Sequence, residues 1–180
     1  IFQMSKLIIV SNRLPLNITI ENDVLSVSAS SGGLATGMRS VHDKGGSLWI
    51  GWSGIEEENL DLNLNKKINN QLVNENCASV SLTKTEVNDF YYGLSNKTLW
   101  PLFHYFTEFS TFDNNQWESY KKVNQKFADI VISNLSDGDR IWVHDYQLML
   151  LPSMIRKMNP NVTIGFFLHI PFPSYEIFRI

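Results

Sequence analysis

The chain has 180 residues, with 15 Lys and Arg against 18 Asp and Glu, so its formal net charge is -3. With 43% hydrophobic and 18% charged residues, the composition is typical of a globular protein and excludes an intrinsically disordered chain. The slightly acidic charge gives no general attraction to nucleic acid or to anionic membranes, so neither partner is expected.

The single cysteine, Cys77, excludes an internal disulfide framework and a cysteine-based zinc site. The four histidines follow no metal-binding spacing, and we expect neither a metal nor a cofactor. No run approaches the roughly 20 apolar residues that span a bilayer. The start of the sequence carries no basic region followed by a long apolar stretch, so a cytoplasmic protein is expected.

The two ends of the sequence suggest a piece of a longer protein. Met4 directly precedes the first predicted strand, and we expect it to be the native start, with residues 1–3 foreign to the protein. The last residues, 175–180, form an amphipathic stretch without a cap or polar tail. We therefore expect further chain beyond Ile180.

The first half of the chain alternates between predicted strands and helices. A continuous apolar run over residues 6–11 predicts a buried strand, and alternation over 17–29 predicts a hairpin. A helix is predicted over 34–44 and a second buried strand over 47–52. Residues 55–76, rich in Asn and Glu, predict a surface loop followed by a peripheral helix.

The second half continues the alternation. The predicted elements are a strand over 78–82, a helix capped by Thr85 and running through Phe90 and Tyr91, an aromatic helix or turn over 96–105, a helix over 115–135, a strand over 140–144, a helix over 148–158 and a strand over 162–169. Strands that alternate with helices indicate βαβ units. The predicted fold class is α/β, with a Rossmann-like, mostly parallel sheet and flanking helices.

Polar residues follow three of the predicted strands, where ligands bind in open parallel sheets. Arg13 can clamp a phosphate through its planar fork, or be an ordinary exposed loop arginine. Asp145 can accept hydrogen bonds from sugar hydroxyls or cap the next helix. Its neighbour His144 is expected on the opposite face in a structural role. A histidine in apolar surroundings such as those of His169 is usually a satisfied core residue, and its place at a strand end strengthens the alternative of a functional role.

A glycine pair and two aromatic residues are weaker candidates. Gly32-Gly33 precedes a predicted helix, where backbone N–H groups can approach a phosphate, although a turn glycine pair is a common alternative. The chain lacks the G-x-G-x-x-G and P-loop patterns, which argues against a standard nicotinamide dehydrogenase or ATPase. Tyr91 and Trp100 can stack on a sugar face or simply fill the edge of a core.

Six motifs in order resemble one family, over residues 6 to 180 but without a match at 16–29 and 55–76. They are Ser11-Asn12-Arg13-Leu14-Pro15, Ser31-Gly32-Gly33-Leu34, Trp49-Ile50-Gly51-Trp52-Ser53-Gly54, Ser95-Asn96-Lys97-Thr98-Leu99-Trp100-Pro101, His144-Asp145-Tyr146-Gln147-Leu148 and Phe166-Phe167-Leu168-His169-Ile170-Pro171-Phe172-Pro173. In these motifs the chain resembles the N-terminal part of the trehalose-6-phosphate synthases.

The resemblance implies a fold and a reaction. Members of this family are retaining glucosyltransferases with the two-domain GT-B architecture. They transfer glucose from UDP-glucose to glucose 6-phosphate, releasing UDP and trehalose 6-phosphate, and require no catalytic metal. Residues 4–180 are then the truncated N-terminal, acceptor-side domain. The C-terminal nucleotide-sugar domain is absent, so we expect the chain alone to be inactive.

The resemblance also implies roles for individual residues. Arg13, Tyr91, Trp100 and Asp145 would bind glucose 6-phosphate, with Tyr91 rather than Tyr92 assigned by register on Ser95-Asn96. On the donor side, Gly32 and Gly33 would lie against the diphosphate of UDP-glucose, and His169 would face its glucose. In the family, attack is thought to occur on the same face that UDP leaves. His169 and Asp145 would therefore be catalytic by orienting and polarising rather than as nucleophile or base.

Other readings stay open from the sequence alone. A catalytically silent relative could bind sugar phosphate and regulate a partner, and another GT-B transferase could use a related acceptor. A homo-oligomer is neither indicated nor excluded. The presence of a following phosphatase domain and the nucleotide of the donor are equally open.

Overall fold

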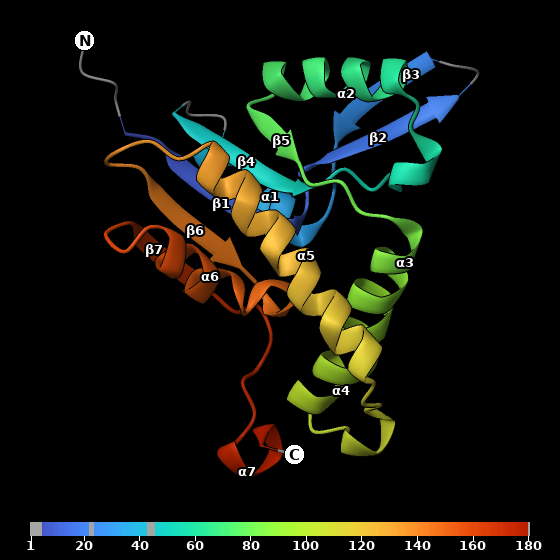
Figure 1. Cartoon of the computed structure of the whole chain (residues 1–180), viewed down its shortest axis with the longest axis vertical. Coiled ribbons are helices and arrows are strands. Elements are labelled where there is room, and N and C mark those ends of the chain that lie inside the picture. The colour runs from blue at the N-terminus through green and yellow to red at the C-terminus, as the bar shows by residue number, and fades with distance from the viewer. Residues whose placement is uncertain (1–4, 22–23, 43–45, 180) are drawn as a thin grey trace.

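The computed structural model describes residues 5–21, 24–42 and 46–179, and the expected start at Met4 lies outside these ranges. Its centre is a five-stranded sheet in the order β5-β4-β1-β6-β7, with every neighbouring pair parallel (Figure 1). The strands are β1 (Leu7–Arg13), β4 (Ser47–Trp52), β5 (Cys77–Ser79), β6 (Arg140–His144) and β7 (Thr163–Phe167). The predicted α/β class with a mostly parallel sheet is confirmed.

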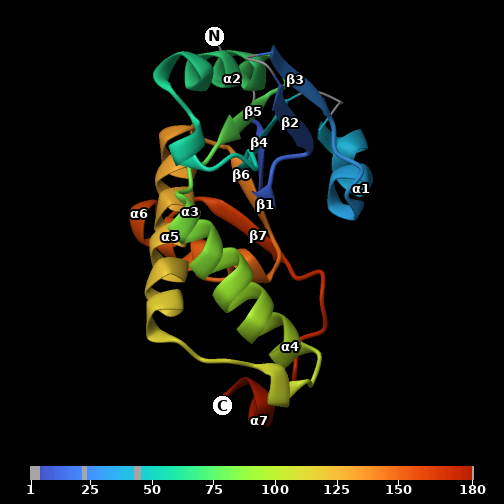
Figure 2. The ribbon, with the colours of Figure 1, turned by 90° about the vertical axis from the view of Figure 1, so that its right-hand side faces the viewer.

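The sheet is covered on both faces because its central strand is apolar throughout. Ile8 and Val10 of β1 point into one core cluster, and Ile9 between them points into the other. The first cluster includes residues of α5 (Asn114–Ser133) and α6 (Leu151–Met158), and the second includes residues of α1 (Gly33–His42) and α2 (Leu62–Asn74). Figure 2 shows α1 and α5 on opposite sides of the sheet. A strand buried on both faces is the continuous apolar run that the sequence displays.

Strands β2 (Leu16–Glu21) and β3 (Val24–Ala29) form the predicted hairpin, an antiparallel pair beside the main sheet. The predicted surface loop contains the short helix η1 (Glu57–Asn59), and the predicted peripheral helix is α2. Asp61 caps α2 by accepting a hydrogen bond from the backbone N–H of Leu64. These predictions are confirmed.

Two local predictions are wrong. The strand expected over 78–82 is only Cys77–Ser79. Val80 and Leu82 are buried as the alternation requires, but the last hydrogen bond to β4 is the one from the Val80 N–H to the Gly51 carbonyl, and the carbonyl of Leu82 instead accepts from the N–H of Glu57. The helix cap is Thr83 rather than Thr85. The Thr83 hydroxyl accepts from the N–H of Glu86, and the Glu86 carboxylate accepts from the N–H of Thr83, which forms a capping box.

The connection between β5 and α5 is mostly helical. It comprises α3 (Lys84–Glu86), the π-helix η2 (Val87–Leu99), α4 (Trp100–Phe103) and η3 (Thr107–Phe109). After β6 and β7 come η4 (Tyr146–Leu148) and α7 (Tyr175–Phe178). None of the helices described is long and apolar enough to cross a membrane.

The strand order fixes where a ligand can bind. Counted within the main sheet alone, the order is 3-2-1-4-5, so the chain winds outward from β1 in both directions. Ligands of such sheets bind beyond the carboxyl ends of the strands at the point of reversal. Here that point lies between β1 and β6, which end at Arg13 and His144.

Candidate active site

A cavity of about 220 Å³ lies at the point where the winding reverses. Four of the residues predicted from the sequence line it: Arg13, Gly32, Tyr91 and Asp145. Its volume is below the roughly 300–1,000 Å³ of clefts that enclose a drug-sized ligand, so on its own it accommodates a small polar group. Residues widely separated in sequence therefore meet at the position that the topology selects.

Arg13 is placed by its backbone and by two neighbouring residues. The register of β1 against β4 shifts between Val10 and Arg13, and Gly51 permits this irregular end. A Cβ at Gly51 would lie 2.7 Å from the backbone carbonyl carbon of Arg13. The guanidinium lies 4.8 Å from the centre of the Trp52 ring, within the range of a cation–π interaction.

The guanidinium also fills the space that Gly54 leaves open. Gly54 has a φ of +92°, and a Cβ there would lie 2.2 Å from Nη2 of Arg13 and 2.6 Å from Cζ. Arg13 is exposed and forms no salt bridge with any carboxylate in the described part of the chain. A positioned cation without a protein anion is suited to bind an anionic ligand.

Asp145 occupies a strained turn at the end of β6. Its φ of 76° and ψ of 169° lie in a region used almost only by glycine, at a cost of about 1–3 kcal/mol. Its Oδ1 accepts hydrogen bonds from the backbone N–H groups of Tyr146 at 3.0 Å and His169 at 3.2 Å. The predicted capping role is thus confirmed, and one carboxylate ties the ends of β6 and β7 together.

Buried side chains of α5 hold the residues after this turn by hydrogen bonds. Tyr120 of α5 donates its hydroxyl to the carbonyl of Tyr146 at 2.7 Å, and Asn124 donates to the carbonyl of Gln147 at 3.1 Å. The Tyr146 hydroxyl in turn donates to Oδ1 of Asn96 at 3.0 Å, and burial raises the pKa of this phenol. These contacts hold the residues that follow the strained backbone of Asp145, and Asn96 of the Ser95–Pro101 motif takes part in them.

His144 and His169 form a pair that the sequence did not predict. Nδ1 of His144 lies 3.0 Å from Nε2 of His169, although the residues are 25 positions apart. His144 is 1% exposed, and burial, assisted by the nearby His169, lowers its pKa from 6.5 to about 4. His144 was expected to face away from Asp145, yet both line the cavity, because the positive φ of Asp145 interrupts the strand alternation.

The remaining predicted residues differ in their placement. Tyr91 is half-buried in η2 and reaches the cavity, whereas Trp100 is 43% exposed, stacks on His104 at 4.1 Å and lies outside the cavity wall. Gly33 begins α1 directly after Gly32, but does not itself line the cavity.

The cavity wall contains further residues to which the sequence assigned no role, among them Trp49 and Asn12. Trp49 donates its indole N–H to the hydroxyl of Ser11 at 2.8 Å, which fixes the ring in the wall. The buried Oδ1 of Asn12 accepts no hydrogen bond within the described part of the chain. The sequence offered one signal for each: Asn12 lies next to Arg13, and Trp49 belongs to the Trp49–Gly54 motif.

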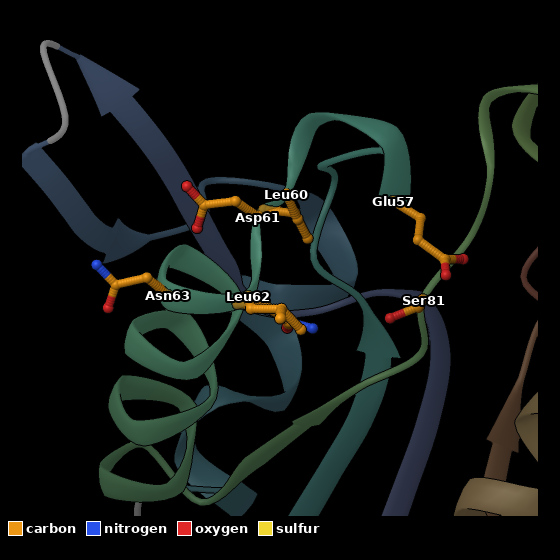
Figure 3. A pocket seen from close by; sticks show the side chains of 7 residues that line it. Glu57, Leu60, Asp61, Leu62, Asn63 and Ser81 are labelled. Carbon is orange, nitrogen blue, oxygen red and sulfur yellow. The ribbon is translucent and has the colours of Figure 1, made fainter.

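A larger hollow of about 640 Å³ lies beside η1 and the start of α2, and Ser81, which follows β5, also lines it. In Figure 3, Asp61 and Asn63 lie on one side of it and Glu57 and Ser81 on the other. The Asp61 carboxylate is already used to cap α2. This hollow lacks the convergent cation, carboxylate and imidazole of the cavity at β1 and β6, which Arg13, Asp145 and His144 supply; His169 contacts His144 from outside the cavity wall.

Comparisons with known proteins identify a family. The pattern that defines glycosyltransferase family 20 matches residues 5–180. An alpha,alpha-trehalose-phosphate synthase (UDP-forming) of Candida albicans is 42% identical, with 97% of this chain and 37% of the relative aligned. The chain thus spans little more than a third of that relative's length.

Solved structures give the same result. An alpha,alpha-trehalose-phosphate synthase (UDP-forming) of Burkholderia xenovorans in complex with glucose-6-phosphate matches with a TM-score of 0.72 and 31% identity, over 96% of this chain and 35% of the other. An E. coli protein bound with UDP-2-fluoro glucose matches with a TM-score of 0.74 and 35% identity, over 97% of this chain and 35% of the other.

Proposed function

Because the chain belongs to glycosyltransferase family 20, we propose that it is the acceptor-side domain of a UDP-forming alpha,alpha-trehalose-phosphate synthase. The intact protein would transfer glucose, with retention, from UDP-glucose to glucose 6-phosphate and release UDP and trehalose 6-phosphate. We place the domain at residues 4–180 and the protein in the cytoplasm.

The observation that carries this proposal is the meeting of Arg13, Tyr91 and Asp145 at one cavity. A sugar phosphate needs a cation for its phosphate, acceptors for its hydroxyls and an apolar surface for its ring. The guanidinium of Arg13, the carboxylate of Asp145 and the ring of Tyr91 supply these three features. In the proposed complex Trp100 completes the acceptor side after a rearrangement that brings its exposed ring to the sugar.

The donor would bind beside the acceptor at the start of α1. Gly32 borders the cavity, and a Cβ at Gly33 would meet nothing within 4 Å. The protein's own packing therefore does not require glycine at residue 33, which is consistent with close approach of a ligand. The free N–H groups and the positive dipole end of a ten-residue helix stabilise the negative charge of a diphosphate.

The proposed reaction separates charge between the donor sugar and UDP, and Asp145 and His169 act on the acceptor and on the donor sugar respectively. Positive charge develops on the donor ring while negative charge develops on the departing UDP. In the proposed mechanism the acceptor hydroxyl attacks on the face that UDP leaves and passes its proton to the departing phosphate. Asp145 orients the acceptor and His169 hydrogen-bonds the donor glucose. The basic groups that hold UDP would belong to the second domain.

The test uses the intact protein with UDP-glucose and glucose 6-phosphate in the presence of a chelator. We expect trehalose 6-phosphate and UDP by mass spectrometry, with no dependence on added metal. Folded protein that binds glucose 6-phosphate but releases no UDP, also with ADP-glucose and GDP-glucose as donors, would refute the proposal. That result would favour a regulatory sugar-phosphate binder.

A further inference from the structure

The histidine pair has an unusual hydrogen-bond balance. His144 is buried, its Nδ1 faces Nε2 of His169, and its own Nε2 has no hydrogen-bond partner among residues 5–21, 24–42 and 46–179. Two neutral imidazoles can share this contact in two ways. Either His144 donates from Nδ1, or His169 donates from Nε2.

The buried environment distinguishes the two arrangements. If His169 donated, His144 would carry its proton on Nε2 and bury an N–H group without an acceptor. If His144 donates, its buried Nε2 is a bare acceptor instead. Buried N–H groups without partners are rarer in proteins than under-satisfied acceptors. The favoured arrangement is therefore the one in which the Nδ1–H group of His144 donates a hydrogen bond to Nε2 of His169.

This choice fixes the chemistry that His169 offers to a ligand. A neutral His169 that accepts at Nε2 carries its proton on Nδ1, on the other side of the ring from His144. The side chain of His169 is exposed, and its backbone N–H is held by Asp145 at 3.2 Å. Its position is thus set by one contact to the backbone and one to the ring.

We propose that His144 is a positioning residue that holds His169 in the Nδ1–H tautomer, so that His169 donates a hydrogen bond to a hydroxyl of the donor glucose. This inference rests on the proposed function for the identity of the sugar. Trp142 packs on the ring of His144 at 4.7 Å between centres, and Phe167 packs on that of His169 at 4.7 Å. These apolar rings restrict the pair without offering a competing acceptor.

The kinetic test uses two variants of nearly identical shape in the intact protein. His144→Asn keeps a donor close to the position of Nδ1, whereas His144→Leu removes it. We expect His144→Leu to lower kcat about 3- to 10-fold, the range for one lost hydrogen bond, with an unchanged KM for glucose 6-phosphate. His144→Asn should recover most of this loss. Phe167→Leu, which alters the packing of His169 but not its hydrogen bond, is the matched control.

UDP-sugars that each lack one hydroxyl separate positioning from general damage. The wild-type protein should discriminate most strongly against the analogue without the contacted hydroxyl, and His144→Leu should lose that discrimination selectively. Equal losses for all analogues, or Asn no better than Leu, would overturn the proposal.

Selective labelling of histidine with ¹⁵N gives a readout that is independent of activity. Ring nitrogen shifts should show His144 protonated on Nδ1 and His169 also protonated on Nδ1 at neutral pH. A proton on Nε2 of His144 would refute the inference even if the protein makes trehalose 6-phosphate. Conversely, the expected tautomers without transfer activity would refute only the proposed function and the sugar assigned to His169.

Discussion

Replacing Gly54 by alanine tests whether this glycine places Arg13. The new methyl would lie 2.2 Å from Nη2 and 2.6 Å from Cζ, so the guanidinium must leave its position over Trp52. A hydrogen bond to a charged group contributes about 1.5–3 kcal/mol, which corresponds to a change of about 10- to 150-fold. We therefore expect the KM for glucose 6-phosphate to rise by about that factor.

The same substitution also strains the backbone, and a control must separate the two effects. A non-glycine residue at the φ of +92° costs about 1–2 kcal/mol of folding free energy. Gly138 has a φ of +83°, and a Cβ there would meet only Ser5 Cβ at 3.5 Å. Gly138→Ala thus introduces similar strain away from Arg13.

The assay measures UDP release from the intact protein while glucose 6-phosphate, or free glucose, is varied. Gly54→Ala should weaken the use of glucose 6-phosphate but hardly affect free glucose, which has no phosphate. Gly138→Ala should affect only the thermal midpoint. An unchanged KM in Gly54→Ala, or an equal increase in Gly138→Ala, would refute the assignment of Gly54 as the residue that positions Arg13.

Three further predictions concern the same site. Arg13→Ala should raise the KM for glucose 6-phosphate about 10- to 150-fold while the thermal midpoint moves by about 1–2 °C, as for a surface substitution; an unchanged KM would remove Arg13 from the site. Gly33→Ala has open space for its methyl, so thermal unfolding should show equal or slightly higher stability. Its KM for UDP-glucose should nevertheless rise, and unchanged donor kinetics would contradict a diphosphate at this position. Unfolded His144 takes up a proton below pH 6.5, whereas the folded residue resists it until about pH 4. The free energy of unfolding should therefore decrease as the pH is lowered from 6.5 to about 4, and this decrease should be smaller in His144→Leu when denaturation is measured across the range. The same pH dependence in the wild-type protein and the variant would refute this prediction.

The order of the elements could be predicted because apolar runs, alternation and helical periodicity are local properties. Strand order is not local, so the neighbourhood of β1 and β6 became visible only in the structure. The error at β5 has a related cause: Val80 and Leu82 alternate and are buried, but burial alone does not pair a strand. The cap at Thr83 had a signal, because Glu86 follows three residues later.

For the site, the residue types at the strand ends were sufficient to predict that Arg13 and Asp145 lie close together, and both line the same cavity. The contact between His144 and His169 could not be predicted, since it depends on the side-by-side packing of β6 and β7 and on the strained backbone of Asp145. The stacking of Trp100 on His104 is a local contact, because the two residues are four positions apart at α4, but it leaves the ring outside the cavity wall. The roles of the individual residues toward substrates stay predictions.

The central position of β1 has a consequence for synthesis of the protein. Its partner β4 follows soon after it along the chain, but its other partner, β6, begins only at Arg140. At about 5–20 residues per second, the ribosome leaves one edge of β1 unpaired for several seconds. An apolar strand with a free edge is prone to pair with other chains. Protection of the nascent chain by a chaperone during this interval would therefore favour its folding, and the cavity between β1 and β6 can form only at its end.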